Sequence, residues 1–445
     1  MKNSILLDKI LLVIYNILFL LVPVDLNIFG VSYSKLLFAY SLVIFLYLKF
    51  YKKVNVKKLF SSNKTFKFIS IGFFVFFLSV ITSIIINSII DKNINISNFY
   101  EILRVVLYYL IFFNFYNLLN KKNLKTFNIS MIVLIFFNII LAFFQFHNIF
   151  GLNELYVKYI ASTQYETLIN GYKWPRAVAL AGNPNVLGFL LTLFSIYILF
   201  VISKNYKKFY YYIIYLLILI SVFLSASRTS YIALVFSNVV YIFLLFFKFK
   251  KKDIFKTFSI CTLFLILHVL ILFLLPNSYT WRIKTIINFQ NESSWQKRED
   301  MNQEFIENIK NSQTDNNNNN NNNNDNDDDS NLENNIEDYT KKNNVITFII
   351  GNGPDKDKNK HEGYFDNEWF KIFFNYGFLG ILSYLFMMIL PIFTIKKNRN
   401  FNYSLYVAII IANFIYMLTS ASYHSYLLFG ITMILFSLSL KKEIN

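Results

Sequence analysis

Two carboxylates stand directly before a membrane-length apolar run in the C-terminal third of the chain. Asp366, Asn367 and Glu368 close the longest hydrophilic stretch, and the predominantly apolar segment 369–395 follows at once. Asp366 or Glu368 could accept the proton of a hydroxyl group, as a general base does. The same residues could instead begin a helix, because Asp is a favoured cap and acidic side chains there interact well with the helix dipole.

An arginine also stands just outside an apolar run. Arg176 is followed by Asn183 and Pro184, which are typical of a helix start with Asn as the cap and Pro as the first helical residue. The predicted span 184–202 therefore begins there. The planar guanidinium of Arg176 could hold a phosphate through two hydrogen bonds. Alternatively, this long side chain only reaches towards the lipid headgroups.

A run of small residues separates two apolar runs by only a few positions. Residues 225–227 are Ser, Ala and Ser, which suit a tight helical hairpin because small side chains let helices approach closely. Thr229 or Ser230 is predicted to cap the returning helix. The hydroxyl residues then have a structural explanation, and Arg228 is left to be explained.

Arg228 and Arg298 are the other candidates for phosphate binding. Arg228 could bind a diphosphate, or it could pair with a carboxylate such as Glu101 or Asp366. Arg298 lies in the segment 295–309, whose apolar residues are spaced like one face of a helix. A loop arginine is more often a solvated surface residue, so that alternative stays open for Arg298.

The composition places these residues in a membrane protein. Of the 445 residues, 55% are hydrophobic and only 16% are charged. Apolar runs of roughly 18–25 residues match the length that a helix needs to cross a bilayer. Continuous runs, rather than alternating residues, exclude a β-barrel. The single cysteine excludes an internal disulfide, and the four histidines lack the spacing of a metal site.

Hydropathy and charge together predict the topology. About twelve runs are long enough to span a bilayer, and every cluster of basic residues follows an even-numbered run. Both termini are then cytoplasmic by the positive-inside rule. The net charge of +17 comes mainly from these loops, so it does not indicate a nucleic-acid partner. The predicted runs are 9–30, 32–50, 67–90, 101–119, 128–150, 184–202, 210–226, 230–247, 257–275, 369–395, 402–420 and 424–440.

The predicted spans fall into two blocks around one long extracytoplasmic loop. Residues 1–275 hold nine spans, residues 276–366 form the loop, and residues 367–445 hold the last three spans. The loop contains an Asn- and Asp-rich insertion at about 315–330, which has no apolar face to bury and is expected to be disordered. We interpret the insertion as a tolerated repeat expansion. A short strand or helix is predicted at 345–350.

The end of the loop resembles a signature of one family of membrane enzymes. Asp366 and Asn367, an aromatic residue two positions on and Gly-Phe-Leu-Gly at 377–380 resemble the last signature of the O-antigen polymerase and O-antigen ligase superfamily. These proteins are bacterial surface-polysaccharide glycosyltransferases. The loop pattern of the superfamily closes with a Gly-x-Gly turn, matched here by Gly351 and Gly353.

Two earlier stretches are similar to the same superfamily. Arg176 with Gly-Asn-Pro-Asn at 182–185 resembles one signature, and Ser-x-Ser-Arg at 225–228 resembles another. Arg298 occupies the place of an arginine that the superfamily commonly carries near an amphipathic loop helix. The resemblance covers residues 160–440, and the N-terminal spans match only in hydropathy.

The resemblance implies a fold, a reaction and roles for these residues. The expected fold is an all-α polytopic membrane protein of the C-type glycosyltransferase kind. The implied reaction transfers a glycan from undecaprenyl diphosphate to an acceptor hydroxyl, without a metal, a nucleotide or another cofactor. Asp366 or Glu368 would act as the base, Arg298 would take part in catalysis, and Arg176, Arg228 and Arg298 would bind the diphosphate.

The acceptor and the partners follow from the same resemblance. A polymerase extends another undecaprenyl-diphosphate-linked unit, whereas a ligase transfers the glycan to lipid A-core in lipopolysaccharide biosynthesis. Asp366-Asn367 favours an O-antigen polymerase, and a capsule or exopolysaccharide polymerase fits equally well. Ligases commonly carry a histidine near this position, and His361 lies five residues too early. A polysaccharide flippase is the alternative of a different class. Expected partners are the lipid-linked oligosaccharide, membrane lipid and a chain-length regulator, in the bacterial cytoplasmic (inner) membrane.

Overall fold

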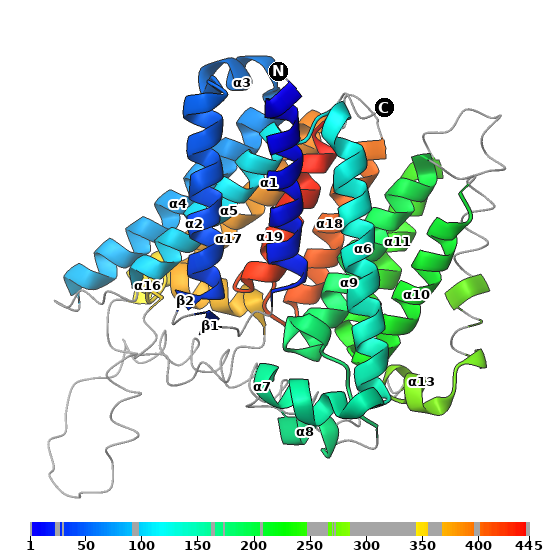
Figure 1. Ribbon diagram of the computed structural model, residues 1–445. Coiled ribbons are helices and arrows are strands. Elements are labelled where there is room, and N and C mark those ends of the chain that lie inside the picture. Colours follow the sequence, from blue (N-terminus) through cyan, green and yellow to red (C-terminus); the bar gives the residue numbers. More distant parts are fainter. Residues whose placement is uncertain are drawn as a thin grey trace, which may run out of the picture.

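A computed structural model of the protein shows a bundle of long helices (Figure 1). It describes residues 2–22, 27–28, 31–90, 98–161, 165–171, 174–204, 208–246, 266–268, 270, 273–284, 344–354, 367–395 and 401–441. The regular secondary structure of these residues is helical, apart from one antiparallel pair of strands, β1 (Asn27–Ile28) and β2 (Val31–Ser32). In that pair Asn27 lies opposite Ser32, and Ile28 opposite Val31. The expected all-α class is confirmed for this part of the chain.

The long helices follow the predicted apolar runs, because a run of Leu, Ile and Phe in a membrane can satisfy its backbone hydrogen bonds within a helix. They are α1 (Lys2–Leu20), α2 (Tyr33–Leu46), α4 (Lys64–Ile90), α5 (Phe99–Leu118), α6 (Lys121–Phe146), α9 (Pro184–Lys204), α10 (Tyr210–Ser225), α11 (Arg228–Phe246), α17 (Glu368–Ile395), α18 (Phe401–Met417) and α19 (Tyr426–Ser439). The shorter helices are η1 (Tyr47–Tyr51), α3 (Val56–Ser62), η3 (Ile149–Gly151), η4 (Asn153–Val157), α7 (Lys158–Ile160), α8 (Tyr165–Ile169), η5 (Ala179–Ala181), α13 (Asn277–Lys284) and α16 (Asn344–Ile350).

Seven of the described helices are long and apolar enough to cross a membrane. They are α2 continued by η1, α4, α5, α6, α9, α11 and α17, and the apolar helices α10, α18 and α19 are shorter. The protein is therefore a multi-pass helical membrane protein by the length and composition of its helices. The count of twelve spans stays a prediction, since most of the run 257–275 lies outside the described residues.

The first helix differs from the prediction at both ends. Hydropathy predicts a span at 9–30, whereas α1 begins at Lys2 and ends at Leu20. Pro23 explains the early end, because proline lacks a backbone N–H and disfavours helical geometry in the residue before it. The chain then enters α2 through the strand pair.

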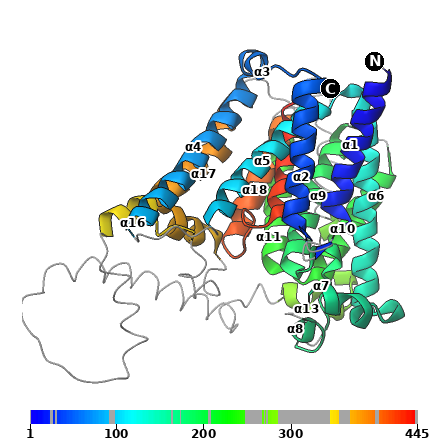
Figure 2. The same ribbon diagram turned by 60° about the vertical axis from the view of Figure 1, so that its left-hand side comes forward.

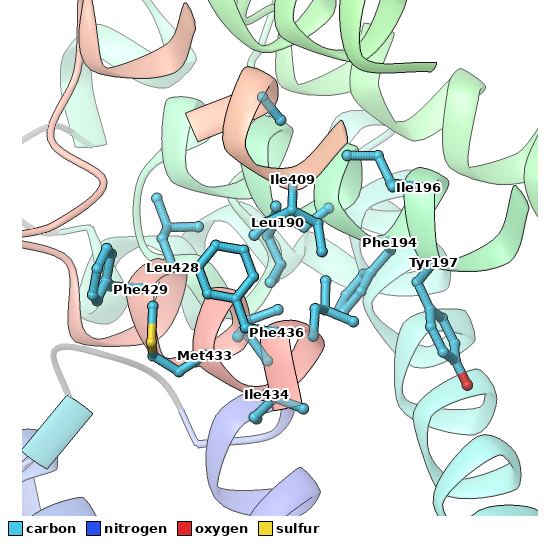
Figure 3. Close-up of a cluster of buried hydrophobic side chains, with 14 of the residues drawn as sticks. Leu190, Phe194, Ile196, Tyr197, Ile409, Leu428, Phe429, Met433, Ile434 and Phe436 are labelled. Carbon is cyan, nitrogen blue, oxygen red and sulfur yellow. The ribbon is translucent and has the colours of Figure 1, made fainter. Parts of the chain in front are cut away.

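Helix α9 lies at the centre of the bundle. In the most apolar stretch of α9, 94% of the residues are buried inside the protein. The helix packs against α10, α11, α18 and α19. Figure 3 shows Leu190 and Phe194 of α9 in the same apolar cluster as Ile409 of α18 and Phe436 of α19. A helix that is apolar on every face is expected to be buried on every face. The core therefore fixes the helices that carry the polar residues described below.

The bundle has two distinct ends. The first and last described residues lie at the same end, near α3, in both views (Figures 1 and 2). Helices α7, α8, α13 and α16 lie at the other end, which we call the loop end. The turn between α10 and α11, the start of α17 and the segment 418–425 between α18 and α19 also belong to the loop end. The shared position of the two chain ends agrees with an even number of crossings, and its membrane side stays a prediction.

Candidate functional site

Arg176 is held against the turn between α10 and α11, so two of the stretches singled out in the sequence meet. Its Nε donates to the Ser225 carbonyl at 3.2 Å, and its Nη2 donates to Asn185 Oδ1 at 3.0 Å. The backbones of the two segments are also hydrogen-bonded, since the Ala177 N–H donates to the Leu224 carbonyl at 3.0 Å. Arg176 is only 8% exposed. It is therefore part of a packed joint, and the alternative of a side chain reaching only towards headgroups is wrong.

Gly188 lets α9 approach this turn. A Cβ at position 188 would lie 2.7 Å from Ser225 Oγ, which is closer than such atoms pack. Asn183 Oδ1 accepts a hydrogen bond from the Asn185 N–H at 2.8 Å, and α9 begins at Pro184. The predicted cap and the predicted helix start are both confirmed.

Helix α11 begins at Arg228, so the prediction that Thr229 or Ser230 caps it is wrong. Both residues lie in the first turn, and their hydroxyls connect neighbouring elements instead. Ser230 Oγ donates to the Asn185 carbonyl at 3.2 Å, and Thr229 Oγ1 lies 2.5 Å from Thr419 Oγ1. Arg228 itself is half-buried at the start of the helix.

The segment 418–425 connects this joint to the start of α17. Besides the threonine contact with α11, the Tyr423 carbonyl accepts a hydrogen bond from the Tyr108 hydroxyl of α5 at 2.6 Å. The Tyr423 N–H donates to Glu368 Oε2 at 3.0 Å, and His424 Nδ1 contacts Glu368 Oε1. One short segment therefore binds α5, α11 and α17 together at the loop end.

Glu368 is buried rather than displayed on an open membrane surface. Its exposed fraction is 0%, and each carboxylate oxygen has a partner in the segment 418–425. Such partners are required because an isolated buried carboxylate would cost several kcal/mol. The His424 side chain lies against Glu368 and is 10% exposed. The expectation that Glu368 faces a sugar hydroxyl from the lip of the span is corrected accordingly.

A second buried pair of charges lies in the first turns of α5. Arg104 Nη1 donates to both oxygens of Glu101, at 2.5 and 2.6 Å, and the Tyr376 hydroxyl of α17 donates to Glu101 Oε2 at 3.0 Å. The Arg104 guanidinium carbon lies 5.0 Å from the centre of the Tyr426 ring, a cation–π contact. Glu101, which the sequence offers as a partner for Arg228, is thus held by Arg104 and Tyr376.

The two buried carboxylates share one electrostatic environment. Lys371 and Arg104 interact with both Glu101 and Glu368, and His424 interacts with Glu101 as well. Two acidic and two cationic side chains lie together in this group, with His424 beside them. We call Glu101, Arg104, Glu368, Lys371 and His424 the charged cluster.

Three buried polar atoms beside the charged cluster have no hydrogen-bond partner among the described residues. They are Arg104 Nε, Ser422 Oγ and Tyr423 Oη. Ser422 is 0% and Tyr423 1% exposed. Since buried polar groups are normally hydrogen-bonded, these three atoms are exceptional among the described residues.

Helix α17 is broken at Gly377, and the break is filled by the end of the long loop. Gly377 has φ 65° and ψ −164°, a conformation essentially restricted to glycine. The two halves of α17 run in different directions (Figures 1 and 2). The Phe374 and Asn375 carbonyls accept hydrogen bonds from the backbone N–H groups of Asn352, at 2.7 Å, and Gly353, at 3.0 Å. The predicted Gly-x-Gly turn is thus fastened to the helix that carries Glu368.

Several predicted functional elements lie outside the described residues: Asp366, Arg298, His361, the amphipathic segment 295–309 and the insertion 315–330. The structure nevertheless identifies the cap of α17. Asn367 Oδ1 accepts a hydrogen bond from the Trp369 N–H at 3.0 Å, and the helix begins at Glu368. The alternative role of Asp366 as a cap stays a prediction, since Asp366 lies outside the described residues.

Sequence reasoning missed His424 and Arg104. A signal existed for Arg104, because an ionisable residue inside an apolar run is itself a reason to suspect function, and Glu101 stands three residues earlier on the same face. His424 has a weaker signal, a position in a short polar stretch between the last two apolar runs. Only the fold brings it to Glu368, 56 residues away in sequence.

In comparisons with known proteins, the chain matches no family model, no curated protein and no solved structure.

Proposed function

We propose that the protein is a polymerase of O-antigen or a related bacterial surface polysaccharide. It takes a glycan from an undecaprenyl diphosphate carrier and transfers it to a sugar hydroxyl of a second lipid-linked unit. The reaction takes place at the outer face of the cytoplasmic membrane, so the loop end faces outwards. The apolar helices support a membrane location, and the sequence resemblance supports the class of enzyme.

One observation supports this proposal most. The three stretches that resemble the superfamily are distant in sequence, and the fold connects them at the loop end. Arg176 contacts Ser225 in the turn before α11. Thr229 connects the same turn to the segment 418–425, which in turn binds Glu368. Such convergence is expected of residues that act on one substrate.

The reaction forms one bond, breaks one bond and moves one proton. The acceptor oxygen bonds to the anomeric carbon while the bond from that carbon to the diphosphate breaks, and its electron pair leaves on the diphosphate. The hydroxyl proton passes to a base of the site. Arg176, Arg228 and Arg298 are the proposed diphosphate ligands. Each well-placed donor of this kind stabilises a transition state by roughly 3–4 kcal/mol.

The location of the charged cluster favours surface chemistry over transport. A transporter is expected to place ionisable residues deep within its spans, along the path of the substrate. Glu101 and Arg104 lie instead in the first turns of α5, and Glu368 is the first residue of α17. A reaction at the end of the bundle suits a substrate whose lipid stays in the bilayer.

The test uses purified full-length protein in liposomes with an undecaprenyl-diphosphate-linked repeat unit. We expect a ladder of longer lipid-linked glycans and release of undecaprenyl diphosphate. Adding lipid A-core tests the ligase alternative, because a ligase transfers the glycan to it. An unchanged donor that only moves between the two leaflets would refute glycosyl transfer and support the flippase.

A further inference from the structure

The contact between Glu368 and His424 places a histidine between a buried carboxylate and the edge of the site. The carboxylate is fixed on one side by the Tyr423 N–H and meets His424 Nδ1 on the other. The Glu368 side chain is 0% exposed, and that of His424 is 10% exposed. The imidazole therefore lies nearer the edge of the site than the carboxylate does, although its Nε2 is itself buried.

The carboxylate also determines which nitrogen of the ring is basic. In a neutral imidazole one nitrogen carries a proton and the other accepts one. A carboxylate at Nδ1 accepts the Nδ1–H hydrogen bond, so the lone pair lies on Nε2, on the opposite edge of the ring. When Nε2 gains a proton, Glu368 is already in place to stabilise the positive ring. Elsewhere in the cluster, Arg104 forms an ion pair with Glu101.

Two hydroxyl groups lie beside His424 in sequence. Ser422 Oγ and Tyr423 Oη have no hydrogen-bond partner among the described residues, although both side chains are buried. Hydroxyls of this kind can donate to and accept from the several hydroxyls of a sugar. The same short segment thus carries the imidazole and two buried hydroxyls that a sugar could satisfy only if it entered between the helices.

We propose that His424 Nε2 accepts the proton of the acceptor hydroxyl and that Glu368 is the positioning residue for His424. As the proton moves to Nε2, the hydroxyl oxygen bonds to the anomeric carbon, and the diphosphate leaves with the electron pair of the broken bond. The inference rests on the proposed glycosyl transfer and assigns its proton acceptor. It also replaces direct action by Glu368 with action through the histidine.

The test is His424→Ala in the purified full-length protein with the lipid-linked repeat unit as substrate. We expect kcat to fall by roughly 10²-fold or more, the usual contribution of a positioned base, with little change in KM. Added imidazole restores part of the turnover, because a small base can enter the space left by the ring. Glu368→Gln keeps an oxygen for the Tyr423 N–H and removes the charge. It lowers kcat and does not respond to imidazole.

His147→Ala is the matched control. His147 is an exposed histidine at the end of α6, hydrogen-bonded to the Tyr279 hydroxyl at 2.6 Å and outside the charged cluster. This variant should keep the wild-type turnover and show no response to imidazole. The comparison separates loss of one particular base from loss of any histidine at this end of the bundle.

The possible failures are distinguishable. A wild-type protein that transfers no glycan refutes the proposed function itself. An active wild type with an equally active His424→Ala variant refutes only the role of His424. Should the alanine variant fail to fold, His424→Gln fills a similar volume with an amide that is not a base. Wild-type turnover in a folded His424→Gln protein would overturn the inference in the same way.

Discussion

The backbones of Gly351 and Gly377 are in direct contact, although one ends the long loop and the other interrupts a membrane helix. A Cβ at Gly351 would lie 2.5 Å from Gly377 N, and a Cβ at Gly377 would lie 2.5 Å from Gly351 N. Asn87 of α4 donates from Nδ2 to the Gly351 carbonyl at 3.0 Å. The contact therefore holds the loop, the break in α17 and helix α4 together.

Gly351→Ala should disrupt this joint, and Gly353→Ala should not. Both positions have positive φ, 77° and 82°, so both substitutions strain the backbone by roughly 1–2 kcal/mol. At Gly353, however, the nearest atom to an added Cβ is 3.4 Å away, in Asn87. We expect a much larger fall in melting temperature for Gly351→Ala than for Gly353→Ala, and loss of long-chain product for Gly351→Ala only. Equal effects of the two substitutions would show that the close contact is not important.

Arg176→Lys should abolish most activity while the protein still reaches the membrane. The guanidinium donates in two directions, to the Ser225 carbonyl and to Asn185 Oδ1, and one ammonium on a flexible stem cannot reproduce that planar geometry. Long-chain glycan should fall strongly, measured against the amount of protein in the membrane. Asn185→Asp is the control, since its carboxylate still accepts from Arg176. Full activity of Arg176→Lys would contradict a role that depends on the guanidinium.

Local signals in the sequence predicted local structure well. Apolar runs located the long helices, and Asn183 with Pro184 located the start of α9 because capping and proline geometry depend only on neighbouring residues. Gly351 and Gly353 located a turn for the same reason. The predicted cap at Thr229 or Ser230 failed because several adjacent polar residues could each cap, and hydropathy alone could not choose between them.

The charged cluster could not be predicted from such signals. From the sequence, Glu368 is only the polar first residue of a span. Its burial depends on Tyr423 and His424, which lie 55 and 56 residues further along the chain. Similarly, Tyr376 meets Glu101 across 275 residues. Contacts between residues so far apart in sequence depend on how the helices pack around α9. The sequence of one span does not indicate which other spans it packs against.

Labelling of single cysteines should place the two ends of the bundle on opposite sides of the membrane. Cys261→Ser removes the only cysteine. In that background, Tyr159→Cys places a cysteine in α7 at the loop end, where the native Tyr159 is 77% exposed. Lys57→Cys places a cysteine in α3 at the other end, where the native Lys57 is also exposed. A membrane-impermeant maleimide should label position 159 in intact spheroplasts and position 57 only after lysis. The reverse result would put the charged cluster inside and remove the proposed reaction.

The buried pair of Glu101 and Arg104 should behave as a unit. Removing one partner of a buried ion pair typically costs 3–5 kcal/mol, because the other charge is left in apolar surroundings. We therefore expect Glu101→Gln to lower the free energy of unfolding in detergent more than the double substitution Glu101→Gln, Arg104→Gln does. Tyr376→Phe removes only one hydrogen bond to Glu101 and should cost about 1 kcal/mol.

The double substitution also separates stability from activity. Arg104 interacts with both carboxylates, so its loss changes the charge around Glu368 even when the fold is retained. We expect the double variant to fold and to make far less long-chain glycan than Tyr376→Phe at the same membrane level. If the effects of the two single substitutions on stability simply add, the two side chains are not coupled in the folded protein. If the folded double variant keeps wild-type turnover, the pair only supports the structure, and the balance of charge around Glu368 does not matter for the reaction.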